Sequence, residues 1–420
     1  MKNLMKTKKI ISEIEKTAKK YQEKINQKLR RQANRRIDLW ILIKIAAILF
    51  FTAIIAAEYF DMRKVIPAPA APAAESIESK IGQMLIVGFR GTQAQSDAPI
   101  AGTIKDLNLG GVILFDYDAP SKTAGRNIAD PEQTKKLVAD LKSYSQNQPL
   151  LVAIDAEGGQ INRLKPSLGF ADIASAQSLA KLDGSVALEN YWDLAKELVY
   201  LGFNLNFAPV VDLNINPKNP AIGGLERSYS KKPAIVSTLA KAMVAAHKSF
   251  GILTALKHFP GHGSSKSDSH LGLVDVTDTY QERELDPYEK LIKDGAVDSV
   301  MTAHIVNRNI DPDYPATLSP KFIQNILREK LGFDGVVFSD DMQMGAIVKN
   351  YGFEDAIIRA INAGCDILVF SNNNADTGYD DTIAQRAHDA ILNAVRDGRI
   401  TESRINQSYE RIMKLKNKLK

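Results

Sequence analysis

The stretch ILTALKHFPGHGSSKSDSH (252–270) joins an apolar run to a polar loop that is rich in His. Its apolar beginning predicts a buried strand, which ends in a cation and an imidazole, Lys257 and His258. Pro-Gly-His-Gly then breaks regular structure, and the polar loop that follows carries Asp268 and His270 two residues apart. An Asp can hold one ring nitrogen of a His while the other nitrogen moves a proton. We therefore favour a catalytic loop over an ordinary solvated loop.

Similar apolar runs alternate with amphipathic helical stretches from Ser76 onward. Eight strands are predicted, at residues 82–89, 111–115, 150–155, 205–212, 253–258, 299–305, 336–340 and 366–371. Helices are predicted at residues 131–145, 187–201, 234–250, 287–294, 320–331, 354–363, 382–396 and 402–418. This alternation predicts an α/β fold, a single (β/α)₈ barrel of the TIM type. The alternative is a doubly wound sheet, but the turn at Gly88–Gly91 lacks its glycine-rich phosphate fingerprint.

Charged or imidazole side chains follow five successive predicted strands. In a barrel these positions meet at one mouth, where the chemistry takes place. The residues at these strand ends are Asp155 and Glu157, Asp212, Lys257 and His258, His304, and Asp340 and Asp341. Carboxylates, imidazoles and cations without a metal motif fit glycoside hydrolysis or another acid–base reaction on a polar substrate.

Other chemistries lack support in the sequence. There is no zinc-type Cys/His cluster and no phosphate-binding loop, so we expect no metal and no cofactor. The basic excess is confined to residues 1–36, which carry a net charge of +10 against −5 for the rest, so nucleic acid is not an expected partner. The single cysteine, Cys365, lies in an apolar run and is expected to be an inert core thiol.

The N-terminal region predicts a membrane anchor. The run LWILIKIAAILFFTAIIAA (39–57) is nineteen residues long with one charge, about the length needed to cross a bilayer. The basic segment 1–36 precedes it, so the positive-inside rule places that segment in the cytoplasm. We therefore expect a transmembrane signal-anchor at 37–60 in the bacterial inner membrane, with the rest of the chain outside the cytoplasm. A cleaved signal peptide fits less well, because its charged region would be too long.

The remaining organisation is simple. Residues 61–76, rich in Pro and Ala, form a stiff spacer. Residues 77–420 form the barrel domain, with no second domain expected after the last strand.

Beyond these physical arguments, the chain resembles a known family. The motifs are IDAEGG (154–159), NFAPVVD (206–212), ERSYS (226–230), KHFPGHG (257–263), DSH (268–270), VMTAHI (300–305), PATLS (315–319), LGFDGVVFSDDM (331–342) and AGCDILVF (363–370). Together they are similar to glycoside hydrolase family 3, and most of all to its β-N-acetylglucosaminidases.

The resemblance implies roles for seven residues. Asp340 matches the nucleophile of a retaining mechanism, His270 the general acid/base and Asp268 its partner. The sugar-binding positions are matched by Asp155, Arg227, Lys257 and His258. Physical chemistry agrees with these roles: a carboxylate can form a glycosyl-enzyme, and a His of near-neutral pKa can protonate the leaving oxygen and later activate water. Arg227 and Asp155 could make bidentate bonds to sugar hydroxyls.

The expected function is that of a membrane-anchored exo-β-N-acetylglucosaminidase acting on peptidoglycan fragments or chito-oligosaccharides. One alternative is a β-N-acetylglucosaminide phosphorylase, because a His tolerates a phosphate anion better than a Glu does. Others are a β-glucosidase of the same family and a non-catalytic wall-binding protein. The single domain and the Asp-x-His pattern favour the hexosaminidase branch over the glucosidases. The oligomeric state is not predictable from the sequence.

Overall fold

The computed structural model describes residues 75–419. The predicted span at 37–60 and the spacer up to residue 74 lie outside these residues, so the membrane anchor stays a prediction. Among the helices that are described, none combines the length and the apolar character that crossing a bilayer requires.

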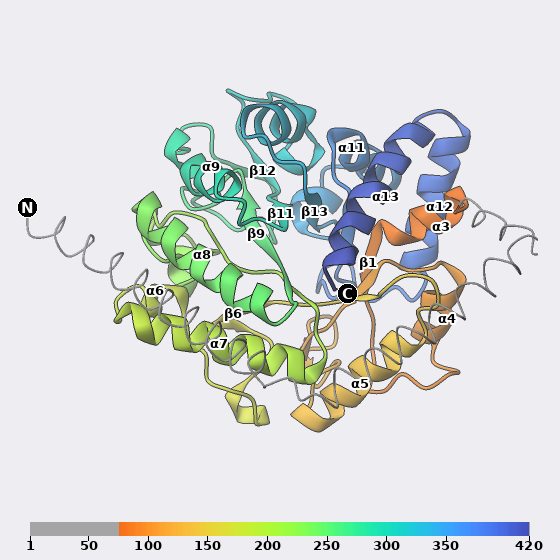
Figure 1. Ribbon diagram of the computed structural model, residues 1–420. Coiled ribbons are helices and arrows are strands. Elements are labelled where there is room, and N and C mark those ends of the chain that lie inside the picture. Colours follow the sequence, from red (N-terminus) through yellow and green to blue (C-terminus); the bar gives the residue numbers. More distant parts are fainter. Residues whose placement is uncertain (1–74, 420) are drawn as a thin grey trace, which may run out of the picture. The chain divides into compact units, whose positions relative to one another are not determined.

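Within residues 75–419, eight parallel strands close into one barrel, and each strand pairs with its two neighbours. The strands are β1 (Leu85–Gly88), β2 (Gly111–Ile113), β5 (Leu151–Ile154), β8 (Leu205–Asn206), β9 (Leu253–Phe259), β11 (Ser299–Thr302), β13 (Val336–Asp341) and β14 (Ile367–Phe370). All eight predicted strands are present, and the predicted (β/α)₈ barrel is confirmed. The helices form a ring around the strands in chain order (Figure 1).

The α- and π-helices of residues 75–419 include all eight that the sequence predicts, close to their predicted positions, and four that it does not predict. The eight are α5 (Pro131–Ser143), α7 (Gly184–Leu201), α8 (Pro233–Ser249), α9 (Asp286–Lys293), the π-helix η5 (Lys321–Lys330), α11 (Phe353–Ala363), α12 (Ile383–Arg396) and α13 (Glu402–Lys416), and the four are α3 (Ile77–Gln83), α4 (Pro99–Asp106), α6 (Ala176–Leu179) and α10 (Gly345–Val348). Local signals explain several of these starts. Asp130 caps α5 by accepting from the Gln133 amide, and Pro131 occupies its first position.

Six of the eight predicted strands are shorter than the sequence indicated, and the first and fourth lose the most residues. The first was expected from Gly82, but Ser76 caps a helix that runs to Gln83, and Gly82 packs directly against the Leu107 carbonyl. The fourth was expected to run to Asp212, but the ladder ends at Asn206. Apolar character alone cannot separate a strand end from a buried loop.

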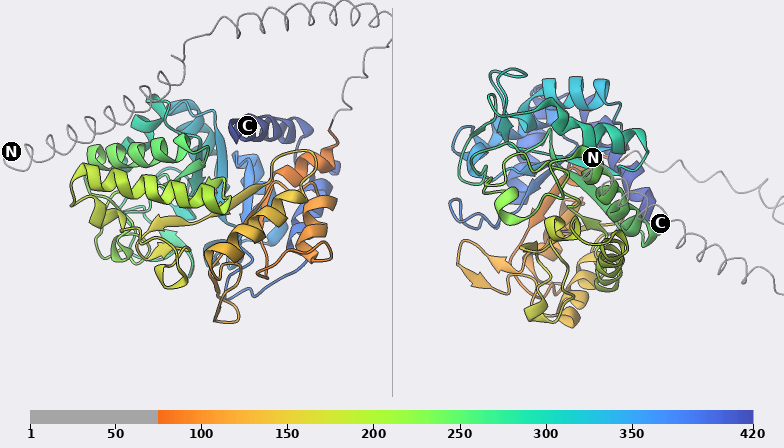
Figure 2. Two further views of the ribbon diagram at one scale, coloured as in Figure 1. Left: turned by 60° about the horizontal axis from the view of Figure 1, so that its bottom comes forward. Right: turned by 90° about the vertical axis from the view of Figure 1, so that its left-hand side faces the viewer.

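Three further pairs of short strands lie in the loops that follow the barrel strands. They are β3 (Tyr117–Asp118) with β4 (Thr123–Ala124), β6 (Ala156–Gly158) with β7 (Ile161–Asn162), and β10 (Val274–Asp275) with β12 (Ile305–Val306). The β3–β4 hairpin projects from the barrel in the right-hand view of Figure 2. These additions extend the mouth where the barrel strands end.

The opposite end of the barrel is covered by α13. In the left-hand view of Figure 2, this helix lies across one end of the barrel. Buried Asp366 holds it there by accepting from Arg404 Nη2 at 3.3 Å and Ser408 Oγ at 2.8 Å. Buried Lys416 adds bonds to Gln83 Oε1 at 2.6 Å and to the Gly110 carbonyl at 2.9 Å.

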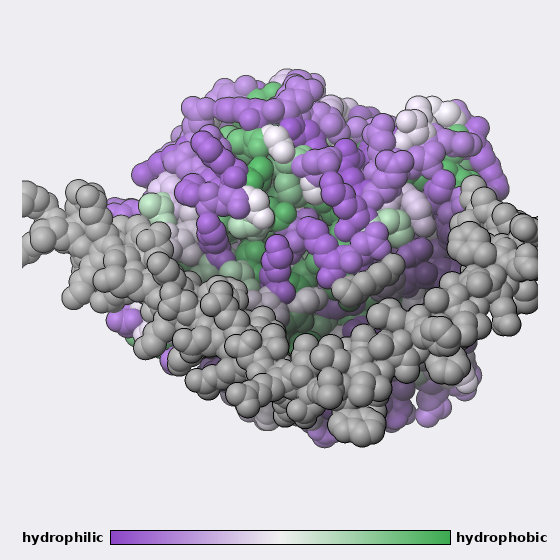
Figure 3. Space-filling model, viewed as in Figure 1, coloured by the Kyte–Doolittle hydropathy of each residue, from purple (hydrophilic) through white to green (hydrophobic). Residues whose placement is uncertain are grey.

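The core consists of apolar strand side chains packed against the inner faces of the helices. The surface seen in Figure 3 is mostly hydrophilic, with hydrophobic residues showing mainly near its middle. Cys365 is fully buried, and burial raises the pKa of its thiol to about 12, so the prediction of an inert core thiol is confirmed.

Candidate active site

A cavity of about 430 Å³ lies at the mouth where the barrel strands end. All seven residues singled out from the sequence line it: Asp155, Arg227, Lys257, His258, Asp268, His270 and Asp340. Lys257, His258 and Asp340 lie in strands β9 and β13, and Asp155 directly follows β5, while the other three come from two loops. The barrel thus brings together side chains that are up to 185 positions apart in the chain. The prediction that polar strand ends converge on one site is confirmed for three of the five strand ends, whereas Asp212 and His304 are buried and do not line the cavity.

Cations and carboxylates alternate on the cavity floor. Lys257 Nζ lies 2.7 Å from Asp155 Oδ1 and 2.7 Å from Glu157 Oε1. Arg163 approaches the other oxygen of Asp155 at 3.6 Å. Burial alone would raise the pKa of Glu157, but Arg227 and Lys257 outweigh it and lower that pKa to about 2. The floor therefore presents fixed charges to a polar substrate.

Arg227 is oriented by Glu157 rather than left free. Its Nε and Nη2 atoms donate to the two Glu157 oxygens at 2.8 Å each, and Nη1 donates to the Ala221 carbonyl at 2.8 Å. We expected the bidentate bond of Arg227 to reach sugar hydroxyls, but it goes to Glu157. The sequence places Glu157 near a strand end but does not indicate its bond to Arg227, because the two residues lie 70 positions apart.

A buried layer beneath the floor fixes His258. Its Nδ1 lies 2.7 Å from Asp212 Oδ2, and its Nε2 lies 3.2 Å from Arg227 Nη2. A guanidinium can only donate, so Nε2 accepts and the ring proton on Nδ1 donates to Asp212. Asp212 also accepts from the His262 amide at 2.7 Å. Asp212, at a predicted strand end, is 1% exposed and supports the site from behind.

Asp340 lies at the end of β13 with the properties of an ionised nucleophile. Burial acts to raise its pKa, but the neighbouring His304, His258 and His270 outweigh burial, so the pKa is lowered. Its Oδ1 accepts from the Asp341 amide at 2.8 Å. A carboxylate kept ionised at a barrel mouth can attack an electrophilic carbon.

Asp341 and His304 lie next to Asp340 but have supporting roles. Asp341 accepts from Ser371 Oγ at 2.5 Å and from the Gln343 amide at 3.1 Å. Buried His304 bonds Thr317 Oγ1 at 2.8 Å and the Asp341 carbonyl at 2.9 Å. These contacts hold the turn after β13 in place and occupy both carboxylate oxygens of Asp341.

Asp268 and His270 form a dyad on the loop after β9. Asp268 Oδ1 lies 2.7 Å from His270 Nδ1 and accepts the His270 amide at 2.9 Å. Desolvation favours the neutral ring, but the bond and charge of Asp268 outweigh it, and the pKa of His270 is raised. Desolvation likewise acts to raise the pKa of Asp268, but His270 lowers it to about 2. The His270 side chain is 63% exposed, so its free nitrogen is accessible for proton transfer.

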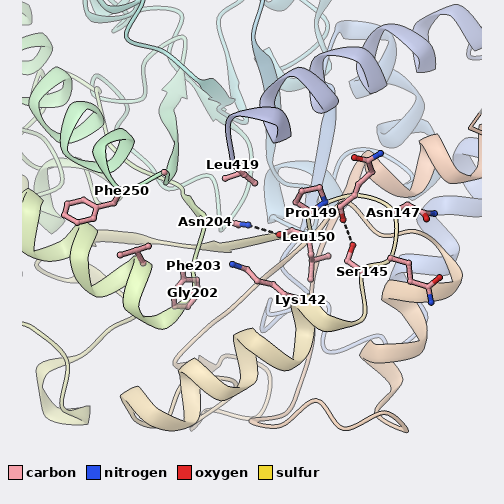
Figure 4. Close-up of a pocket in the computed structure, with 14 residues that line it drawn as sticks. Lys142, Ser145, Asn147, Pro149, Leu150, Gly202, Phe203, Asn204, Phe250 and Leu419 are labelled. Carbon is pink, nitrogen blue, oxygen red and sulfur yellow. Dashed lines mark hydrogen bonds between the residues drawn. The ribbon is translucent and has the colours of Figure 1, made fainter. Parts of the chain in front are cut away.

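A second cavity, of about 510 Å³, lies at the other end of the barrel (Figure 4). Its lining includes Leu150 and Asn204, which directly precede strands β5 and β8. The Asn204 side chain donates to the Leu150 carbonyl at 2.8 Å, the bond drawn between them in Figure 4. This cavity is separate from the charged residues of the mouth and contains no acid–base pair among its lining residues.

Comparison with known proteins supports the resemblance drawn from the motifs. The sequence profile of the glycosyl hydrolase family 3 N terminal domain matches residues 76–415. The chain is 32% identical over 391 residues to Beta-hexosaminidase A of Pseudoalteromonas piscicida, covering 84% of this chain and 63% of that protein. It is 37% identical over 285 residues to Beta-hexosaminidase of Tolumonas auensis, covering 66% of this chain and 80% of the relative.

Solved structures give the same result. A glycoside hydrolase family 3 β-N-acetylglucosaminidase from Paenibacillus matches with a TM-score of 0.74 and 37% identity, over 82% of this chain and 63% of the other. A β-N-acetylhexosaminidase from Beutenbergia cavernae matches with a TM-score of 0.72 and 30% identity, over 81% of this chain and 98% of the other. The chain thus spans under two thirds of some relatives and nearly all of others.

Proposed function

Because this chain belongs to glycosyl hydrolase family 3, we propose that it is a retaining exo-β-N-acetylhexosaminidase that removes terminal N-acetylglucosamine through a covalent glycosyl-enzyme. The observation that carries the proposal is the shared cavity of Asp340 and the Asp268–His270 dyad. Asp340 supplies an ionised carboxylate and His270 of the dyad supplies a proton, which are the two groups that such a reaction needs.

In the first step, Asp340 attacks the anomeric carbon while His270 gives its proton to the leaving oxygen. The raised pKa of His270 keeps the ring protonated for this step. Asp268 holds Nδ1 and stabilises the imidazolium, so the other nitrogen faces the substrate. In the second step, His270 takes a proton from water, and the hydroxide displaces Asp340 from the sugar.

The charged floor binds the non-reducing sugar in this proposal. Asp155 and Lys257 offer an acceptor and donors to sugar hydroxyls, while Glu157 keeps Arg227 and Lys257 at fixed positions. Groups held by other side chains lose little entropy when a sugar arrives, so they support tight positioning. We extend the proposal to peptidoglycan fragments or chito-oligosaccharides as substrates.

Two comparisons of activity test the proposal. N-acetylglucosaminide and glucoside substrates, assayed side by side, separate a hexosaminidase from a glucosidase and from a non-catalytic wall-binding protein. Formation of sugar-1-phosphate in phosphate buffer would instead identify a phosphorylase, which a His acid/base also permits.

A His270→Ala variant tests the role of the dyad. A sugar leaving group needs a proton far more than an activated phenol does. The variant is therefore expected to lose about 10²–10⁴-fold on a disaccharide and much less on the aryl substrate. Equal rises in KM for both substrates, with kcat unchanged, would make His270 a sugar-binding residue instead.

Localisation completes the proposal. The apolar span and its basic flank support a single-pass anchor in the bacterial inner membrane, with the N-terminus in the cytoplasm and the barrel in the extracytoplasmic or periplasmic space. A substrate made of cell-wall fragments would be available on that side.

A further inference from the structure

Within the loop that carries the dyad, the residue between the two dyad residues makes a buried contact. Ser269 is buried, and its Oγ lies 3.2 Å from His262 Nε2. The residues around it face outward: the His270 side chain is 63% exposed and Leu271 is 74% exposed. A general acid on so open a loop needs other contacts to hold it over the cavity.

Those contacts come from the segment that follows β13, the strand that carries Asp340. The Gly345 amide donates to the His270 carbonyl at 3.1 Å, and the Ala346 amide donates to the Ser269 carbonyl at 3.2 Å. Both amides belong to the first turn of α10, where backbone N–H groups have no partner within the helix. Asp340 precedes Gly345 by only five residues, so one stretch of chain carries the nucleophile and contacts the acid/base loop.

The close approach requires glycine at position 345. A Cβ atom there would lie 2.7 Å from the His270 carbonyl oxygen and 2.9 Å from the Leu271 carbonyl carbon. Both are backbone atoms, which cannot turn aside as a flexible side chain can. Any larger residue at 345 would displace the loop from its present position.

Lys349 adds a third contact. Its Nζ donates to the Leu271 carbonyl at 3.1 Å and pairs with Asp376 Oδ2 at 2.8 Å. Asp376 belongs to the loop after β14 and lines the same cavity. The Lys349 ammonium therefore links the dyad loop to the loop after β14, although Lys349 and Leu271 lie 78 positions apart in the sequence.

We propose that Gly345, Ala346 and Lys349 form a latch that holds His270 in reach of the glycosidic oxygen, with Lys349 as a positioning residue for proton transfer. The inference rests on the proposed role of His270 as general acid. The latch acts on the backbone of the loop and contributes no proton. It sets how much of the time the imidazole occupies the position from which it can protonate the leaving group.

A Lys349→Met variant of the full-length chain tests the latch. Its disaccharide turnover is expected to fall about 3- to 30-fold, the size expected when one partly exposed hydrogen bond that positions the acid is lost. Turnover of an activated aryl substrate is expected to fall less than about 2-fold, because that leaving group needs little proton donation. Lys349→Arg keeps a donor and is expected to recover most of the disaccharide rate. A Gly345→Ala variant should show the same split between substrates.

The matched control is Lys290→Met, which removes a similarly exposed lysine of α9 that pairs with Asp294, the residue after that helix. It is expected to change neither rate. Equal losses on both substrates with Lys349→Met, or no loss on either, would overturn the latch. If His270→Ala shows the split and Lys349→Met does not, the latch fails while the proposed function stands. If His270→Ala shows no split, both fail.

Discussion

Replacing Lys416 with Met is expected to make the stability difference from the wild-type chain depend on pH. Lys416 is 1% exposed, with two hydrogen bonds, to Gln83 and to the Gly110 carbonyl. A neutral amine has two N–H donors and both are used, whereas an ammonium would carry a third proton without a partner. Burial accordingly lowers the pKa of Lys416 from 10.5 to about 7.

Proton linkage gives the direction and the size of this pH-dependent change in the free energy of unfolding. Between pH 7 and 10.5 the unfolded chain binds the proton and the folded chain releases it, so wild-type stability rises with pH. From pH 7 to pH 9, the free energy of unfolding of the wild type should increase by about 2 kcal/mol relative to Lys416→Met. Met also leaves the two acceptors without a donor, but that cost of about 1–3 kcal/mol does not vary with pH.

Urea titrations of both proteins at pH 7, 8 and 9, followed by circular dichroism, measure the difference. The matched control is Lys414→Met on the same helix, because Lys414 is 72% exposed and its difference from the wild type should stay constant. A constant difference for Lys416→Met as well would show that the folded chain carries a charged Lys416 over this range, and the reasoning would be refuted.

Three further predictions concern the mouth and the anchor. Asp340→Ala should abolish turnover with little change in the melting temperature, whereas Asp341→Ala should lower the melting temperature because it removes the bonds that hold the turn after β13. Asp268→Ala should move the alkaline limb of the pH–rate profile for disaccharide cleavage to lower pH, because Asp268 raises the pKa of His270 and the first step needs the protonated ring. A reporter that works only outside the cytoplasm should be active when fused to the C-terminus and lose its activity when residues 37–60 are deleted. A reporter active only in the cytoplasm would reverse the topology.

The barrel could be predicted because its signals are local. Each strand is a short apolar run, and each of the five polar strand ends follows its run directly, as Asp340 follows Val336–Ser339. Parallel strands in a barrel all end at the same mouth, so positions along the chain were enough to place Asp155, Lys257, His258 and Asp340 together. Asp268 and His270 could be read from the loop that follows a strand, but Arg227 was indicated only by the family resemblance.

Contacts between distant segments could not be predicted in the same way. The bidentate bond of Arg227 to Glu157 and the bond of Lys349 to the Leu271 carbonyl depend on how loops of irregular backbone lie over the barrel. No periodicity encodes such geometry, and a strand-end polar residue looks the same whether it faces the cavity, like Asp340, or is buried behind it, like Asp212. The sequence therefore identifies the reactive groups better than it identifies what holds them.

Covalent labelling tests the central claim most directly. A fluorosugar that mimics N-acetylglucosamine and carries a good leaving group should form a stable adduct in a retaining enzyme, because its second step is slow. Peptide mass spectrometry of the full-length chain should then place the sugar on Asp340, with no label in Asp340→Ala. An adduct on Asp341 or Asp155 would contradict the assignment of the nucleophile. Turnover of the parent substrate without any covalent adduct would contradict the retaining mechanism itself.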